Sequence, residues 1–243
     1  MVVQNHMKYS AIHVWGDSIA RGIVYNPEKQ RYAISKARCT DALQQAVECE
    51  VVNHSVMGAT VREGMEAFAR FTPVRDALCA VEYGGNDCDP NWQQLSDDPT
   101  RPVTARVPLE EYSEHLRDFV RRIRRAGMKP MLITPLPICP ERYFAWVTRN
   151  RQADHVLKAL GDVGHIYRWQ ERYSLAMRHV AAETGTPLLD LRDCFLALDH
   201  YENYLCQDGI HPNEAGYRLL SAAVLDAAQA DPAMPWRSQQ KEA

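Results

Sequence analysis

Five short apolar runs, separated by stretches with helical periodicity, constrain the fold of this 243-residue chain more than any other feature. The runs cover residues 11–15, 50–53, 77–83, 130–134 and 187–190. Strands that are apolar over nearly their whole length are typical of parallel sheets that helices cover on both faces. The alternation therefore predicts a doubly wound α/β fold with right-handed crossovers, formed by a single domain over residues 1–230.

Helices are expected in the stretches between these runs. The clearest one starts after Pro108 and stops at Gly127, and its apolar residues recur at helical spacing: Leu109, Tyr112, Leu116, Phe119, Val120 and Ile123. Further helices are expected at about 38–48, 61–70, 165–184 and 213–230. The tail, residues 231–243, is polar with two prolines, and we expect it to be frayed.

Composition and charge exclude several kinds of partner. The formal net charge of −3 gives no reason to expect nucleic acid, and the basic residues 121–125 are interpreted as the solvated end of a helix. No apolar run approaches the roughly 18 residues that span a bilayer, so no membrane insertion is expected.

The seven cysteines are scattered and form no Cys-x-x-Cys pair, and the start of the chain carries no secretory signal pattern. A cytoplasmic protein without a metal site is expected, while its oligomeric state stays open.

Four short motifs carry polar residues suited to catalysis. They are Gly-Asp-Ser at 16–18, Asn53 to Gly58, Gly-Gly-Asn-Asp at 84–87 and Asp-Gly-Ile-His at 208–211. Three of them follow predicted strands, and the fourth lies in a late loop before the last helix. In open α/β sheets ligands bind at the carboxyl ends of the strands, so we expect the four motifs to converge there.

These residue types fit ester hydrolysis by a serine. Such a reaction needs an exposed hydroxyl, a base that removes its proton, and donors aimed at the developing oxyanion. Ser18 opens a helical turn after the first strand, and His211 could take its proton while Asp208 fixes the histidine tautomer. A plain helix cap at Ser18 is an open alternative. A metal site at Asp208 and His211 has no partner with convincing ligand spacing.

Two further residues could donate to an oxyanion. Gly58 lets the backbone approach a ligand closely, and the side-chain amide of Asn86 could reach the same oxygen. Taken singly, a turn glycine and an ordinary Gly-Gly-Asn turn explain these residues equally well.

The four blocks together resemble the SGNH hydrolases, the GDSL-type esterase and lipase superfamily. The blocks are GDSIARG (16–22), NHSVMG (53–58), GGND (84–87) and DGIHP (208–212), and Ile19 replaces the leucine of the usual first block. The resemblance spans about 200 residues. It implies a flavodoxin-like three-layer α/β/α sandwich around a parallel five-stranded sheet, and an ester hydrolase that needs no cofactor.

The same resemblance implies a role for each site residue. Ser18 would be the nucleophile, His211 the base and Asp208 its partner. The oxyanion hole would consist of the Ser18 N–H, the Gly58 N–H and the Asn86 amide. Each of these residues stands at the position that the superfamily motif requires.

Two long segments, 87–107 and 135–164, follow strand ends and are expected to shape the substrate site. The candidate substrate contacts are Asp17, Trp92, Tyr143 and Trp146. Aromatic side chains there could stack on a sugar or line an acyl pocket, and packing of the segments onto the domain explains them equally well.

The substrate is expected to be an ester with a short acyl group. No long exposed apolar run suggests a lipid-binding lid, which favours groups such as O-acetyl on carbohydrates or small molecules. A lysophospholipase, a thioesterase, an acyltransferase and a non-catalytic carbohydrate-binding module stay open as alternatives.

Overall fold

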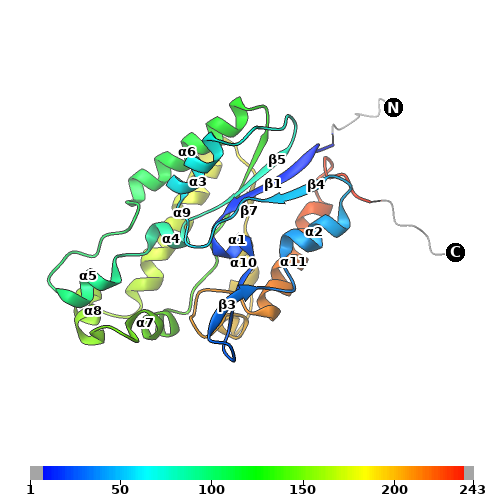
Figure 1. The fold of residues 1–243 in the computed structure, drawn as a ribbon. Coiled ribbons are helices and arrows are strands. Elements are labelled where there is room, and N and C mark those ends of the chain that lie inside the picture. Colours follow the sequence, from blue (N-terminus) through cyan, green and yellow to red (C-terminus); the bar gives the residue numbers. More distant parts are fainter. Residues whose placement is uncertain (1–7, 238–243) are drawn as a thin grey trace, which may run out of the picture.

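A five-stranded parallel sheet forms the centre of the protein in a computed structural model that describes residues 8–237 (Figure 1). Its strands are β1 Ala11–Gly16, β4 Glu50–Asn53, β5 Leu78–Glu82, β6 Lys129–Ile133 and β7 Leu188–Leu189. They stand in the order β4-β1-β5-β6-β7, so the crossovers run in opposite directions on the two sides of β1. This reversal creates the crevice at the carboxyl ends of the strands where ligands of such sheets bind.

Helices cover both faces of the sheet, which confirms the predicted three-layer α/β fold (Figure 1). One face carries α3 Val61–Ala69, α6 Leu109–Arg125 and α9 His165–Thr184. The other carries α2 Cys39–Ala46, α10 Leu191–Leu196 and α11 Glu214–Gln229. The packing of β1 explains why its sequence is apolar apart from His13: Trp15 packs with α3 and α6, whereas Ile12 and Val14 pack into the core on the opposite face.

The two long segments fold into short helices beyond the carboxyl edge of the sheet (Figure 1). The first runs from α4 Gly85–Cys88 into α5 Trp92–Asp97, and the second contains α7 Pro140–Thr148 and α8 Ala153–Leu160. They bury a hydrophobic cluster of their own, to which Trp92, Leu95, Ile138, Val147, Val156, Leu160 and Ile166 belong. The segments are therefore held mainly by packing against each other and against α9.

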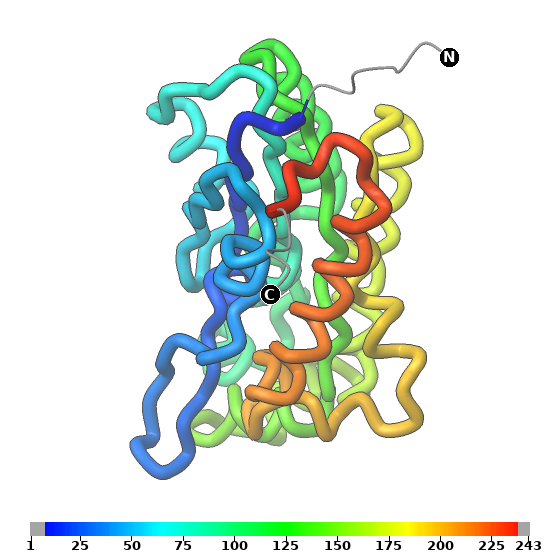
Figure 2. The backbone as a smooth tube through the Cα atoms, turned by 90° about the vertical axis from the view of Figure 1, so that its right-hand side faces the viewer, coloured from blue at the N-terminus to red at the C-terminus, as the bar shows by residue number. Residues whose placement is uncertain are grey.

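A β-hairpin between the first two motifs was not predicted from the sequence. It directly follows α1 Ser18–Arg21 and pairs β2 Ile23–Asn26 with β3 Arg31–Ile34 in antiparallel fashion. In Figure 2 the hairpin projects from the body of the molecule as a blue loop. A hydrogen bond from the Tyr217 hydroxyl of α11 to the Ile23 carbonyl oxygen, 2.8 Å long, fixes its base.

The expectation of a frayed tail is wrong for residues 231–237, while residues 238–243 lie outside the described part of the chain. The Ala233 carbonyl oxygen accepts a hydrogen bond from the Tyr9 N–H at 2.9 Å, and the Pro235 oxygen accepts one from Glu48 N–H at 2.7 Å. Met234 is buried in the same core as α2 and α11. This burial orders the segment beside the start of β1, as Figure 2 shows.

Two further findings concern the helices and the cysteines of residues 8–237. No helix there has the length and apolar character needed to cross a membrane. The seven cysteines are free thiols. The cytoplasmic location stays a prediction.

Candidate active site

Ser18 occupies a tight turn directly after β1. Asp17 caps α1 by accepting a hydrogen bond from the Ile19 N–H at 2.8 Å, which makes Ser18 the first helical residue. Gly16 allows this turn, because a Cβ there would lie 2.7 Å from the Glu82 carbonyl oxygen. The serine hydroxyl is thus held at the carboxyl end of β1.

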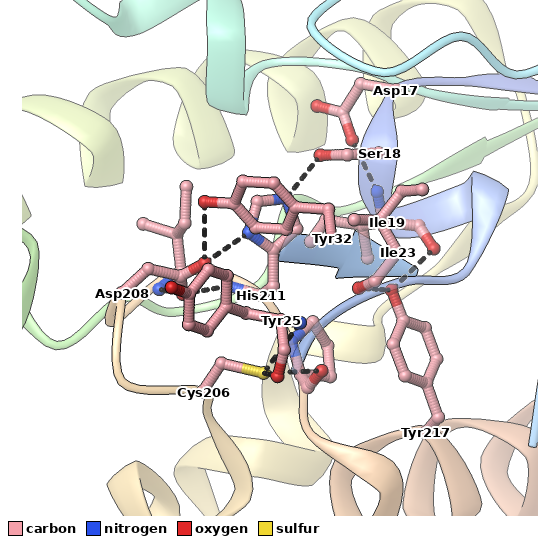
Figure 3. Close-up of polar contacts among 12 residues, drawn as sticks. Asp17, Ser18, Ile19, Ile23, Tyr25, Tyr32, Cys206, Asp208, His211 and Tyr217 are labelled. Atoms are coloured by element: carbon pink, nitrogen blue, oxygen red, sulfur yellow. Dashed lines mark hydrogen bonds and ion pairs between the residues drawn. The ribbon is translucent and has the colours of Figure 1, made fainter. Parts of the chain in front are cut away.

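Ser18, His211 and Asp208 form a continuous chain of hydrogen bonds (Figure 3). His211 Nε2 lies 2.9 Å from Ser18 Oγ, and His211 Nδ1 lies 2.7 Å from Asp208 Oδ2. All three side chains are buried. In the described residues, no third His, Cys, Asp or Glu joins Asp208 and His211 to form a metal site.

The Asp208 carboxylate is stabilised in its ionised form. Burial alone would raise its pKa, but the hydrogen bond and charge of His211, with the backbone N–H groups of Ile210 and His211, hold the pKa below its usual value. Both N–H groups lie 3.1 Å from Asp208 Oδ1. An ionised Asp208 at Nδ1 favours the tautomer that leaves Nε2 free to accept the Ser18 proton.

Three further donors lie at the same cavity as Ser18 and His211. Within residues 8–237, the backbone N–H groups of Ser18 and Gly58 have no protein acceptor. Gly58 has φ +82°, and a side chain would meet nothing within 4 Å, so its backbone faces open space. Asn86 donates from Nδ2 to Asp17 Oδ2 at 2.9 Å and keeps a second amide hydrogen for a ligand.

Two hollows meet at Ser18. The first, which we call the outer cleft, has a volume of about 480 Å³ and is lined by Ser18, Gly58, Asn86, His211, Tyr32, Met57, Trp146 and Arg149, among others. The second, the inner cavity, has a volume of about 80 Å³ and is lined by Ser18 and Asn86 with the apolar side chains of Ile19, Leu136, Ile138, Leu160, Ile166 and Trp169, among others. Trp92, Tyr143, Asp89 and Ile210 line both hollows, whereas His211 lines only the outer cleft.

The wall of the inner cavity is fixed by a buried arginine. Arg192 is fully buried and donates to Gln170 Oε1 at 2.8 Å, while Gln170 Nε2 donates to the Leu136 carbonyl oxygen at 2.6 Å. Arg192 also pairs with Glu171 at 2.5 Å. These contacts tie the loop after β6 to α9 and α10, so the cavity wall is rigid.

All four expected substrate contacts line one or both of the hollows. Trp146 lies in the outer cleft with the Arg149 guanidinium 3.9 Å above its ring, and Trp92 and Tyr143 separate the two hollows. Asp17 lines the inner cavity but is only 2% exposed, and Ile19 N–H and Asn86 occupy its two carboxylate oxygens. It therefore orients Asn86 and caps α1, because a buried carboxylate requires donors from the protein.

Sequence reasoning missed two polar residues of the site. Asp89 accepts hydrogen bonds at Oδ1 from the Tyr143 hydroxyl at 2.7 Å and from Trp92 Nε1 at 2.9 Å, and burial raises its pKa to about 6. Tyr32 donates from its hydroxyl to Asp208 Oδ2 at 3.1 Å. The Asn26–Pro27 pair between two short apolar runs is a turn signal that could have revealed the hairpin that carries Tyr32.

A parallel sheet of this strand order, with a Ser–His–Asp chain at its carboxyl edge, is the arrangement expected of an SGNH-type hydrolase. The sequence model of the GDSL-like Lipase/Acylhydrolase family matches residues 14–219. The chain therefore belongs to this family of carboxylic ester hydrolases.

Curated relatives include esterases from animals and plants. The chain is 29% identical over 182 residues to the isoamyl acetate-hydrolyzing esterase 1 homolog of Mus musculus, a match that covers 71% of this chain and 66% of the mouse protein. It is 24% identical over 178 residues to the GDSL esterase/lipase WDL1 of Oryza sativa subsp. japonica, which covers 72% of this chain and 63% of the rice protein. The match thus spans about two thirds of the length of these relatives.

Solved structures share the fold. The lipase/acylhydrolase from Enterococcus faecalis superposes with a TM-score of 0.60 at 18% identity, covering 94% of this chain and 100% of that one. Axe2, an acetylxylan esterase from Geobacillus stearothermophilus, superposes with a TM-score of 0.57 at 20% identity, covering 92% of this chain and 95% of that one. At these identities the comparison supports the three-layer fold.

Proposed function

We propose that this protein is a serine esterase that hydrolyses carboxylic esters through an acyl-Ser18 intermediate. The observation that carries the proposal is the hydrogen-bonded chain from Asp208 through His211 to Ser18, at an outer cleft that Gly58 also lines; within residues 8–237 the N–H groups of Ser18 and Gly58 have no protein acceptor. A nucleophile, an oriented base and preorganised donors are the parts that acyl transfer requires.

In the acylation step, Ser18 Oγ adds to the ester carbonyl carbon as its proton passes to His211 Nε2. The carbonyl oxygen becomes an oxyanion, which the N–H groups of Ser18, Gly58 and Asn86 stabilise. Asp208 stabilises the imidazolium. The carbon–oxygen bond to the alcohol then breaks, and His211 gives its proton to the leaving alcohol.

In the deacylation step, water replaces the alcohol. His211 takes a proton from the water as its oxygen adds to the acyl carbon, and the same donors hold the oxyanion. The bond to Ser18 Oγ breaks, and the proton returns from His211 to the serine. The sum is ester and water in, carboxylic acid and alcohol out, with no external cofactor.

The two hollows suggest how the ester lies in the site. His211 must protonate the leaving alcohol, and it lines only the outer cleft, so the alcohol part would lie there. The acyl part would then enter the inner cavity, whose volume is about 80 Å³. Because one water-sized position takes about 10–15 Å³, the cavity offers roughly five to eight such positions, which suits a short acyl chain.

The alcohol is proposed to be a small molecule or a carbohydrate. The outer cleft offers the Trp146 ring, on which a sugar could stack, and Asp89, whose carboxylate could accept hydrogen bonds from hydroxyl groups. The printed names of two relatives, an isoamyl acetate-hydrolyzing esterase homolog and an acetylxylan esterase, supply acetyl esters as precedents. O-acetyl groups are therefore the first substrates to test.

A set of esters tests this proposal and its alternatives. We expect hydrolysis of p-nitrophenyl esters from C2 to about C6 and of acetylated xylose, and a steep fall in kcat/KM beyond C8. A preference for long chains would favour a lysophospholipase or thioesterase instead. Faster acyl transfer to an added alcohol than to water would indicate an acyltransferase. No turnover of any ester, together with sugar binding, would indicate a carbohydrate-binding module.

A further inference from the structure

The β2–β3 hairpin is anchored to the loop that carries Asp208 and His211. The Cys206 thiol lies 3.4 Å from the Tyr25 N–H, and on α11 the Glu214 carboxylate accepts a hydrogen bond from the Ser35 hydroxyl at 2.9 Å. Because the hairpin follows directly on α1, it connects the Ser18 turn with the histidine loop (Figure 3). A side chain on this hairpin can therefore act on the reacting residues.

Tyr32 on β3 contacts both Asp208 and His211. Its hydroxyl lies 3.1 Å from Asp208 Oδ2, the oxygen that also faces His211 Nδ1 at 2.7 Å. Its ring lies beside the imidazole, with centroids 5.0 Å apart and an interplanar angle of 57°. Figure 3 shows the tyrosine and histidine contacts meeting on the same carboxylate oxygen. Among the described residues Asp208 thus has four donors, and Tyr32 is the one of these four that comes from outside the loop 208–211.

We propose that Tyr32 is a positioning residue of the esterase reaction: its hydroxyl holds the Asp208 carboxylate against His211 and tempers the basicity of that histidine. The proposal rests on the proposed role of His211 as the base. The phenol is a donor here because burial and the negative charge of Asp208 raise the pKa of Tyr32, so it stays protonated throughout the working range of the enzyme.

The direction of the effect follows from charge. A phenol that donates to Asp208 Oδ2 draws part of the negative charge away from His211 Nδ1, so the imidazolium is less favoured. Other charged or titratable groups also face these three side chains. They are Asp17 beside α1, Arg149 directly after α7 and the thiol of Cys206. None of these groups is changed when the Tyr32 hydroxyl is removed, so Tyr32→Phe isolates its effect.

The main test compares Tyr32→Phe with Tyr25→Phe on p-nitrophenyl acetate. Tyr25 stands opposite Tyr32 in the hairpin register, its ring is 5.2 Å away, and its hydroxyl has no hydrogen bond within residues 8–237. For Tyr32→Phe we expect kcat to fall about tenfold, as for loss of a hydrogen bond to a charged group. The acid limb of the plot of kcat/KM against pH should move to higher pH by about half a unit, because this limb reports protonation of the catalytic base in the free enzyme. Tyr25→Phe should match the parent in both respects.

A double-mutant cycle separates positioning from a purely structural role. If Tyr32 acts through Asp208, Tyr32→Phe in an Asp208→Ala background should change kcat by less than about twofold. An equal loss in both backgrounds, or an unmoved acid limb in Tyr32→Phe, would overturn the proposal. Failure of the proposed function would give a different result. Ser18→Ala would then hydrolyse the ester as fast as the parent, and this outcome does not depend on any Tyr32 variant.

Discussion

The carboxyl edge of the sheet and the two long segments above it are built in different ways. At the edge, Ser18 and His211 are held by hydrogen bonds and backbone turns that leave little freedom, such as the Asp17 cap at 2.8 Å. In the segments, Trp92, Ile138 and Leu160 are held by apolar packing in a cluster of their own. Hydrogen-bonded geometry is specific, whereas apolar packing tolerates substitution when the volume is kept.

We therefore assign different roles to the two regions. The edge residues touch the atoms that every ester has in common, so changes there should affect all substrates alike. The segment residues touch the parts in which esters differ, so changes there should alter the choice of substrate. Substitutions at the carboxyl edge of the sheet and in the two long segments test this division of roles.

The largest effect is expected for Ser18→Ala. Removing the nucleophile should reduce kcat more than about 10³-fold for every ester, because the remaining donors give only residual catalysis. Initial rates on C2, C4 and C6 p-nitrophenyl esters measure this, with thermal unfolding as the check that the fold is intact. Hydrolysis at the parent rate by the purified variant would refute the assignment of Ser18.

The second-largest loss of activity is expected for Asn86→Ala. Loss of one oxyanion donor typically lowers kcat by about 10²–10³-fold, and the loss should be the same for all acyl lengths. Gln93→Ala is the matched control, because Gln93 is another amide that lines the outer cleft. A loss of activity with only one acyl length would indicate that Asn86 contacts the acyl chain and not the oxyanion.

A smaller and selective effect is expected for Ile138→Phe, because the larger side chain reduces the volume of the inner cavity that Ile138 lines. The C6 ester should lose about tenfold in kcat/KM relative to the C2 ester, since one or two methylenes in a pocket are worth 10–200-fold. Ile34→Phe, at a position 44% exposed on the hairpin, is the control. Equal losses for C2 and C6 would show that acyl chains do not enter this cavity.

The smallest effect is expected on the pH dependence of stability, through the buried carboxyl group of Asp87. Its Oδ1 accepts from the Val61 N–H at 2.9 Å, its Oδ2 has no partner in the described residues, and burial raises its pKa to about 7. The folded state therefore binds this proton more tightly than the unfolded state. The stabilisation is complete below the usual aspartate pKa and is lost as the pH rises through about 7.

Asp87→Asn should accordingly flatten the decline in the free energy of unfolding between about pH 4 and pH 7. Urea unfolding of the parent and the variant at several pH values measures it. An identical pH dependence in both proteins would mean that Asp87 is ionised in the folded state throughout this range.

The sequence predicted the parts of the molecule that short-range patterns encode. Apolar runs predicted all five strands of the sheet, and the motifs predicted that Ser18 and His211, 193 positions apart, belong together; they lie 2.9 Å apart. The role of Ser18 and His211 in catalysis stays a prediction that the variants above test.

Features that depend on long-range packing could not be predicted in the same way. The inner cavity arises where Ile138 of the loop after β6, Leu160 of α8 and Trp169 of α9 meet, and no local spacing encodes that meeting. Met234 is ordered by a core that is mostly far away in the sequence. Tyr32 is intermediate: its turn signal is local, but its contact with Asp208 bridges 176 positions.

Covalent labelling tests the central claim most directly. A fluorophosphonate probe should add one label per chain, and peptide mapping should place it on Ser18, because only an activated serine attacks such a probe quickly. The parent should be labelled within minutes, whereas Ser18→Ala should remain unlabelled under the same conditions. Label on another residue, or an unlabelled parent that still hydrolyses esters, would contradict the account.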